Sequence, residues 1–277
     1  MLIHALITTV ALAGLARVAW AWTERYQLPP SEDILIQIND PRHEQLNPEQ
    51  INILVWNMQK GTRNGWENDY RLLSAGKDIL LLQEVLLDEN MGHVLDEHDD
   101  YTYHVAASFR DSWENHNVSG VATASIARPV ASSYLRSFYR EPVIATPKMA
   151  IVAEYSLADT DKTLLTANIH AINFVNKEKH RHMLSELELL LAGHDGPVIL
   201  AGDFNTWTEE KTLSLKQMAQ RLGLSEVIFA EDERTRMFGN ALDWVFVKDL
   251  SVEFSLVHGS VTGSDHKPME VAFSVSG

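Results

Sequence analysis

Polar side chains that can carry out chemistry follow several apolar runs of this sequence. Four runs end in this way: INILVW before Asn57, DILLLQ before Glu84, TLLTANI before His170, and PVILAG before Asp203. Near-continuous runs of Val, Ile and Leu are typical of strands buried on both faces. Side chains at the ends of such strands gather at one edge of a sheet, where ligands usually bind. We therefore expect these four residues to line one cleft.

Further polar residues stand near the later strands. Asp243 opens the run LDWVFV, and the loop TGSDHKP places Asp265 beside His266 just before the final run. Taken singly, each candidate also has an ordinary structural interpretation. Asn57 could cap a turn, His170 could be a satisfied core histidine, and GDFN could be a tight turn from strand to helix. Their joint placement at strand ends favours a functional site.

The candidate cleft collects several carboxylates, which repel one another unless a proton or a metal ion relieves the repulsion. The oxygen donors are Glu84, Asp203, Asn205 and Asp265. Such a set, with few imidazoles and no thiols, suits Mg²⁺ or Mn²⁺ better than Zn²⁺. The chain has no cysteine, which excludes disulfides, thiolate metal sites and cysteine nucleophiles. A hard divalent ion would also bring positive charge to a phosphate.

The composition describes a globular and acidic chain. Of its 277 residues, 45% are hydrophobic and 22% are charged, so the chain can bury a large core as one domain, with two smaller domains as the alternative. The formal net charge of −15 argues against a broad basic surface for long nucleic acids, which bind chiefly through Lys and Arg.

The N-terminal residues differ sharply from the rest. Residues 2–21, LIHALITTVALAGLARVAWA, are almost wholly apolar, and Ala19-Trp20-Ala21 resembles a signal-peptide cleavage site. The stretch is also about long enough to span a bilayer. We expect residues 1–22 to be a signal peptide or a membrane anchor, with a buried helix as the alternative. The protein is then exported (periplasmic or secreted) or membrane-anchored, and a cytoplasmic location is the remaining alternative.

The rest of the chain divides into a linker and one α/β domain. Residues 23–50 are rich in proline and predict a linker with one short strand in DILIQI. Within 51–277, strands are predicted at 51–56, 78–83, 120–127, 149–157, 163–169, 197–201, 242–247, 252–257 and 269–276. One helix should run from near Asn176 to near Gly193, and another should follow GDFNTW, with Thr206 and Glu209 at capping-box spacing. Many strands with few helices indicate packed sheets flanked by helices.

At this point the sequence resembles the endonuclease/exonuclease/phosphatase superfamily, which has the deoxyribonuclease I-like fold. The resemblance covers most of residues 51–273 and rests on WN (56–57), LQE (82–84), NIHAIN (168–173), GDFN (202–205), LDWVF (242–246) and SDH (264–266). It implies a four-layer α/β/β/α sandwich of two mixed sheets flanked by helices. It also implies a phosphoesterase that depends on Mg²⁺ or Mn²⁺.

The resemblance implies roles for the residues at the metal and the phosphate. Glu84 would be the principal metal ligand, and Asn57 would orient the metal site. Asp265 would be a further metal or water contact. Asp203 and Asn205 would position the attacking water and the phosphate.

It also implies roles for the imidazoles. His266, held by Asp243, would be the general base or a phosphate-binding group, because an Asp partner fixes the tautomer and raises the basicity of the ring. His170 would contact the phosphate or protonate the leaving oxygen, with Asn173 nearby. The general base is left open between Asp203 and His266.

The sequence says less about the substrate. Three segments, 63–70, 108–120 and 137–148, are candidate loops around the cleft. Their candidate basic residues for substrate are Arg63, Arg110, Arg140 and Lys148, with solvated surface positions as the alternative. Of these we assign Arg63 and Arg140 to substrate, together with Asn173. The expected substrate is a phosphodiester of nucleic acid or of a small molecule. One alternative is a phosphatase of phospholipids or inositol phosphates that works near a membrane, in contact with lipid headgroups through residues 1–22. The other is a membrane-tethered binding protein without turnover.

Overall fold

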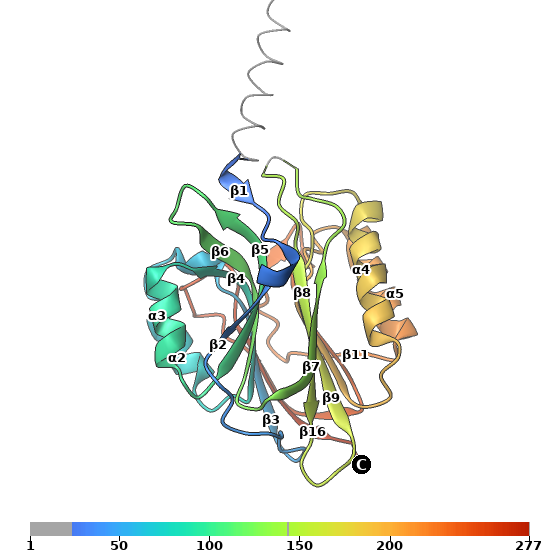
Figure 1. Cartoon of the computed structure of the whole chain (residues 1–277). Helices are drawn as coiled ribbons and strands as arrows, with labels where there is room; N and C mark the ends of the chain where they lie inside the picture. Colours follow the sequence, from blue (N-terminus) through green and yellow to red (C-terminus); the bar gives the residue numbers. More distant parts are fainter. Residues whose placement is uncertain (1–23, 143, 277) are drawn as a thin grey trace, which may run out of the picture.

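Most of the chain forms strands, and a few helices connect them (Figure 1). The computed structural model describes residues 24–142 and 144–276. The strands are β1 (Tyr26–Gln27), β2 (Leu35–Ile38), β3 (Ile51–Asn57), β4 (Ile79–Leu87), β5 (Thr102–Asp111), β6 (Asn117–Ser125), β7 (Pro129–Arg136), β8 (Met149–Ser156), β9 (Thr163–His170), β10 (Val198–Asp203), β11 (Ser225–Glu226), β12 (Arg236–Met237), β13 (Asn240–Ala241), β14 (Asp243–Lys248), β15 (Leu250–Val257) and β16 (Met269–Val275). The helices are α2 (Trp66–Ser74), α3 (Glu89–Glu97), α4 (Lys177–Leu191) and α5 (Glu209–Arg221), with 3-10 turns at Ser31–Asp33 and Gln59–Gly61.

The strands form two large sheets that pack face to face. One sheet has eight strands in the order β1-β5-β6-β4-β3-β16-β15, with β2 also paired to β5. The other has six strands in the order β11-β14-β10-β9-β8-β7. The pairs β3–β4 and β9–β10 are parallel. Both sheets are therefore mixed, as the sequence predicted.

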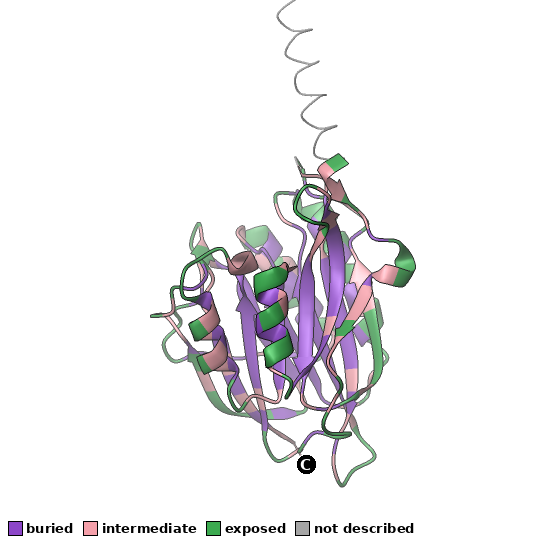
Figure 2. Ribbon diagram, turned by 60° about the vertical axis from the view of Figure 1, so that its left-hand side comes forward, coloured by how far each residue is buried: buried purple, intermediate pink, exposed green. Residues whose placement is uncertain are grey.

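Three apolar layers hold the sandwich together. The middle layer lies between the sheets and includes Ile53 and Ile199. Helices α4 and α5 cover the six-stranded sheet through residues such as Leu187, and α2 and α3 cover the eight-stranded sheet through residues such as Tyr70. Figure 2 shows the result, with buried strands inside and helices exposed only on their outward sides. This is the expected four-layer α/β/β/α sandwich.

All nine strands predicted after residue 50 are present, but several elements were missed. The sequence analysis assigned 63–70 and 108–120 to loops, whereas α2 begins at Trp66, β5 extends to Asp111 and β6 begins at Asn117. Strand β7 and helix α3 were also missed. The helices α2 and α3 have nine residues each, against 15 in α4 and 13 in α5, and so short a segment shows few repeats of a helical pattern.

The start of α5 differs by two residues from the prediction. The N-cap is Thr208, whose side chain accepts a hydrogen bond from the backbone N–H of Lys211. Thr206 is fully buried instead, where its Oγ1 donates to the carbonyl of Ala241 and accepts from Trp244 Nε1. Thr206 therefore ties the turn after β10 to the strand β14.

The segment expected to be a linker is part of the domain. Strand β2 pairs with β5 along its length, and Ile34 and Leu46 are buried in the core. The predicted short strand is present, but the prolines interrupt the segment without detaching it. The expected signal peptide or anchor, residues 1–22, lies outside the described residues. Among residues 24–142 and 144–276, no helix is both long and apolar enough to cross a membrane.

Candidate active site

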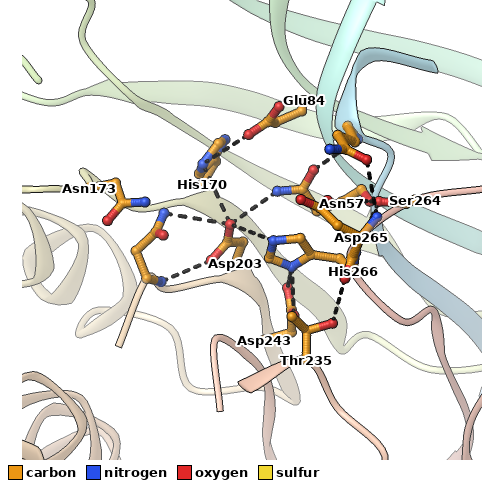
Figure 3. A network of polar contacts seen from close by, with 12 residues as sticks. Asn57, Glu84, His170, Asn173, Asp203, Thr235, Asp243, Ser264, Asp265 and His266 are labelled. Atoms are coloured by element: carbon orange, nitrogen blue, oxygen red, sulfur yellow. Dashed lines mark hydrogen bonds and ion pairs between the residues drawn. The ribbon is translucent and has the colours of Figure 1, made fainter. Parts of the chain in front are cut away.

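Four strand ends and a bulge inside β4 bring the central predicted residues together (Figure 3). In the six-stranded sheet, Asp203 at the end of β10 lies opposite His170 on β9 and Asp243 on β14. In the other sheet, Asn57 ends β3 beside β4. Asn57 Nδ2 donates to Asp203 Oδ2 at 3.0 Å, so a hydrogen bond joins the two sheets at the site.

A β-bulge sets the position of Glu84. The register between β4 and β6 shifts between Leu82 and Val85, and Glu84 takes a positive φ of 50°. Non-glycine residues adopt this conformation at a cost, and such residues gather at functional sites. The carboxylate of Glu84 lies 3.9 Å from His170 Nε2 and 3.9 Å from Lys60 Nζ.

The turn after β10 fixes the carboxylate of Asp203. The backbone N–H of Asn205 donates to Asp203 Oδ1 at 2.9 Å, and Asn205 itself has a positive φ of 50°. Asn205 Nδ2 donates to the carbonyl of Ala171, at the end of β9. Phe204 between them is fully buried. The glycine before them, Gly202, has a φ of 137° because β9 passes too close for a side chain.

His266 is held by Asp243. Its Nδ1 lies 2.8 Å from Asp243 Oδ2 and 3.0 Å from Oδ1, and its Nε2 points toward Asp203 Oδ2 at 3.9 Å. Burial opposes a charge on the ring, but Asp243 and then Asp203 outweigh it and raise the pKa of His266. This is the predicted Asp–His pair.

The two remaining central groups have perturbed pKa values of opposite sign. Burial has the largest effect on the Asp203 carboxyl and raises its pKa. The charge of His266 opposes this rise, and the charge of Asp243 adds to it. Burial, together with the charges of Lys148 and His266, lowers the pKa of His170 well below its usual value. His170 Nε2 lies 3.5 Å from Asp203 Oδ2. Such shifts are typical of functional sites.

The SDH loop is tied to Asn57 through Ser264. Ser264 Oγ donates to the carbonyl of Asn57 at 2.6 Å and accepts from the backbone N–H of His266 at 3.1 Å. Asp265 is exposed, and its backbone N–H donates to Gln59 Oε1. Its carboxylate therefore lies at the outer margin of the site, outside the buried group formed by Asp203, Asp243 and His266.

The residues assigned to substrate lie farther out. Asn173 Oδ1 accepts from Trp207 Nε1 at 2.8 Å and from the backbone N–H of Phe174 at 2.7 Å. Arg63 is exposed, and its Nε donates to Gln59 Oε1. Arg140 lines a different cavity, beside Arg136, Phe138 and Pro147.

The basic residues nearest to Glu84 and His170 are lysines. Lys60 and Lys148 line the cavity beside these two residues. Lys148 was one of several basic residues of the predicted loops, whereas Lys60 was missed. Lys60 follows Asn57 by three residues, in a 3-10 turn where both Gln59 and Lys60 have positive φ angles. That turn directs the chain back toward the site.

A buried pair of amides behind the site was also missed. Gln83 Nε2 donates to Asn168 Oδ1 at 2.7 Å, and Asn168 Nδ2 donates to the carbonyl of Ala122 at 2.8 Å. The pair crosses from one sheet to the other directly before Glu84 and His170. A polar residue inside an otherwise apolar run was the available signal.

The donor set fits a hard divalent cation. Single ligand atoms of Asp203, Asp243 and His266 lie within 4.8 Å of one another. The Asp203 carboxylate is 1% exposed, and its ion pairs among the described residues are with His170 and His266. Burial raises its pKa despite the opposing charge of His266, and a metal ion would relieve that cost. Glu84, Asn57 and Asp203 would hold the ion through oxygen atoms.

This sandwich, with acids and imidazoles at the strand ends, defines a class of phosphoester hydrolases, and sequence comparison agrees. The profile of the Endonuclease/Exonuclease/phosphatase family matches residues 54–266, and the chain belongs to this family. A UPF0294 protein of Vibrio campbellii (strain ATCC BAA-1116) is 37% identical over 232 residues, which cover 82% of this chain and 78% of the relative.

Solved structures share the fold at low sequence identity. The human Nocturnin catalytic domain with bound sulfate aligns with a TM-score of 0.62 at 19% identity, over 90% of this chain and all of that chain (100%). ANGEL2, a 2',3'-cyclic phosphatase solved in complex with adenosine-2',3'-vanadate, aligns with a TM-score of 0.59 at 14% identity, over 85% of this chain and 99% of that chain.

Proposed function

We propose that this chain is a divalent-metal-dependent phosphodiesterase in which water attacks phosphorus in line with the leaving oxygen. The observation that carries the proposal is the group of His170, Asp203 and His266, which converge at the strand ends beside Glu84. A bound Mg²⁺ or Mn²⁺ would stabilise negative charge on the phosphoryl oxygens. The remaining tasks fall to side chains of the protein itself.

We assign these tasks to the pair of Asp243 and His266, to Asp203 and to His170. Asp243 accepts from Nδ1 of His266, which leaves Nε2 facing Asp203 across 3.9 Å. An oxygen of water or phosphate placed there can exchange a proton or a hydrogen bond with either group, so both stay candidates for the general base. His170, on the other side of Asp203, is placed to contact the phosphate or the leaving oxygen.

The sparse positive charge favours a diester over a monoester. Of the lysines and arginines in residues 24–142 and 144–276, Lys60 and Lys148 line the cavity beside Glu84 and His170. Both already have a carboxylate partner, at 3.9 Å for Lys60 with Glu84 and 3.4 Å for Lys148 with Glu141. A phosphomonoester carries nearly two negative charges at neutral pH, whereas a diester carries one.

The test compares diester and monoester hydrolysis by the full chain. We expect Mg²⁺- or Mn²⁺-dependent hydrolysis of bis(p-nitrophenyl) phosphate that EDTA abolishes, and slower hydrolysis of p-nitrophenyl phosphate. Glu84→Gln and His266→Ala should each lower the rate by a factor on the order of a hundred or more. Glu253→Gln, which changes an exposed acid on β15, is the matched control and should leave the rate unchanged.

Two outcomes would redirect the proposal. A faster monoester reaction that still needs the metal and Glu84 would make the protein a phosphatase. Metal binding without hydrolysis of DNA, RNA, inositol phosphates, sphingomyelin or either nitrophenyl ester would instead support a binding protein without turnover.

A further inference from the structure

Exposed aromatic side chains gather at the edge of the sandwich that carries the site. Among the described residues, the exposed Trp and Phe side chains are Trp113, Phe138, Phe174, Phe238 and Phe254, with exposed fractions of 63%, 73%, 62%, 79% and 47%. The first four lie in loops, and Phe254 lies in strand β15. We call the first four the aromatic rim.

Strand directions place all four rim residues at the catalytic edge. Trp113 lies in the β5–β6 turn, and β6 runs antiparallel to β4 from the end that carries Glu84. Phe138 follows β7, whose last residue, Arg136, pairs with Met149 near the His170 end of β9. Phe174 follows β9 directly.

Phe238 comes from a separate hairpin at the same edge. It occupies the turn between β12 and β13, two residues before β13 and five before Asp243 at the start of β14. Because Asp243 pairs with Asp203, this hairpin also stands over the site. The four rim residues therefore come from four different loops around one edge.

The local backbone gives no reason for aromatic side chains in two of these loops. Phe238 has a φ of 50° and is followed by Gly239 with a φ of 84°, which is the backbone of a tight hairpin turn. Asn, Asp and Gly are the residues that suit such a turn. Phe174 also has a positive φ, of 52°. Large apolar side chains held in a costly conformation and exposed to water point to a function outside the fold.

The chain also enters the domain at this edge. Tyr26 and Gln27 in β1 pair with Asp111 and Arg110 at the end of β5, next to the turn that carries Trp113. Figure 1 shows β1 at the same end of the sandwich as the β5–β6 turn. The preceding residues, 2–21, form the long apolar stretch of the sequence, whose length matches the hydrocarbon core of a bilayer. A bilayer that held residues 2–21 would therefore lie next to the aromatic rim.

We propose that the catalytic edge rests on a membrane surface, with the aromatic rim inserted among the lipid headgroups of the bilayer that holds residues 2–21. Trp and other aromatic side chains favour this interfacial zone. The formal net charge of −15 means that attraction to anionic lipid is not the basis of the contact, so a zwitterionic bilayer should suffice. In this arrangement the site opens toward phosphodiesters at the membrane surface.

Cysteine labelling tests the contact directly, since the chain has no cysteine of its own. The full chain is reconstituted in phosphatidylcholine vesicles as four variants, Trp113→Cys, Phe138→Cys, Phe174→Cys and Phe238→Cys, each carrying an environment-sensitive fluorophore. The matched controls are Phe254→Cys on β15 and Leu189→Cys on α4, both also exposed. We expect blue-shifted emission and at least twofold quenching by doxyl-labelled lipid at the rim positions and neither effect at the controls.

Three results would overturn the proposal. The first is a full chain that does not bind to the vesicles. The second is a vesicle-bound chain whose rim labels keep the emission that they have in water. The third is quenching of the control labels to the same extent. If the emission of the rim labels does not change with vesicles but shifts when a single-stranded oligonucleotide is added, the aromatic rim is a nucleic-acid-binding surface instead. Because the readout is not catalytic, this contact and the proposed phosphodiesterase can fail independently.

Discussion

His180 Nε2 lies 2.7 Å from the backbone carbonyl oxygen of Phe204, so helix α4 reaches into the turn that carries Asp203 and Asn205. The ring is fully buried, and the hydrogen bond to a carbonyl oxygen requires Nε2 to carry a proton. Burial lowers the pKa of His180 to about 4. The hydrogen bond to the Phe204 carbonyl opposes this decrease, and the charge of Lys211 adds to it. Burial therefore keeps this histidine neutral at neutral pH, while its Nε2–H holds the turn after β10.

Acid should destabilise the fold through His180. The unfolded chain takes up the proton near pH 6.5 but the folded chain only near pH 4, so the unfolded state binds more protons between these values and stability falls as the pH drops. The full loss from this residue is about 3 kcal/mol. Chemical denaturation of the wild type and His180→Gln at pH 7 and pH 4.5 measures it, because Gln keeps a donor without titrating. Equal losses in the two proteins would refute the assignment.

The amide pair behind the site should contribute both stability and activity. Asn168→Leu removes Oδ1 and Nδ2, which make three hydrogen bonds of 3.2 Å or less between the sheets, and leaves the side chain of Gln83 without its partner across the sheets. A loss of about 2–3 kcal/mol is expected from the buried groups left unpaired. Asn68→Leu, at an exposed position in α2, should change stability by no more than about 0.5 kcal/mol.

Hydrolysis by Asn168→Leu should also fall under conditions where the variant stays folded. Asn168 precedes His170 by two residues and its partner Gln83 precedes Glu84, so the pair sets the distance between both site residues. Full activity in a folded but destabilised variant would show that the pair is structural only.

The strand ends could be predicted because burial and chemistry meet there within one or two residues. An apolar run that stops at Glu84 or His170 contains both signals, and no knowledge of the partner strand is needed. Asn168 shows the limit of this reasoning. A polar residue inside a run is satisfied by groups on the opposite sheet, and the sequence does not say which carbonyl will face it.

Local conformation was the other limit. The bulge that aims Glu84, with its φ of 50°, arises from the pairing of β4 with β6 and leaves no trace in composition. The cap of α5 was assigned to Thr206 because Glu209 follows it at capping-box spacing, whereas the residue three positions after Thr208, the observed cap, is Lys211. Only the pairing of Thr206 with Ala241 and Trp244 decides between them.

Gly202 should tolerate no side chain. A Cβ built there would lie 2.1 Å from the carbonyl oxygen of Ile169, and the φ of 137° is a conformation that other residues avoid. Gly202→Ala is expected to cost more than about 3 kcal/mol, because the strain adds to the displacement of β9 from β10. Gly92→Ala is a control of opposite sign. Gly92 lies in helix α3 with open space around it, so alanine should stabilise by about 0.5–1 kcal/mol. Thermal unfolding of both variants provides the comparison.

Asp243 and His266 should act as one unit in catalysis. Asp243→Asn keeps the shape of the side chain but removes the charge that holds the Nδ1 proton of His266, so the ring can lose its tautomer and its orientation. Each of Asp243→Asn and His266→Ala should lower kcat by a factor on the order of a hundred to ten thousand. The double variant should be little slower than His266→Ala alone, because groups that work together are strongly non-additive. Steady-state kinetics on bis(p-nitrophenyl) phosphate gives all four rates. If the two losses multiply in full, Asp243 serves the reaction by some route other than His266, for instance through the neighbouring Asp203.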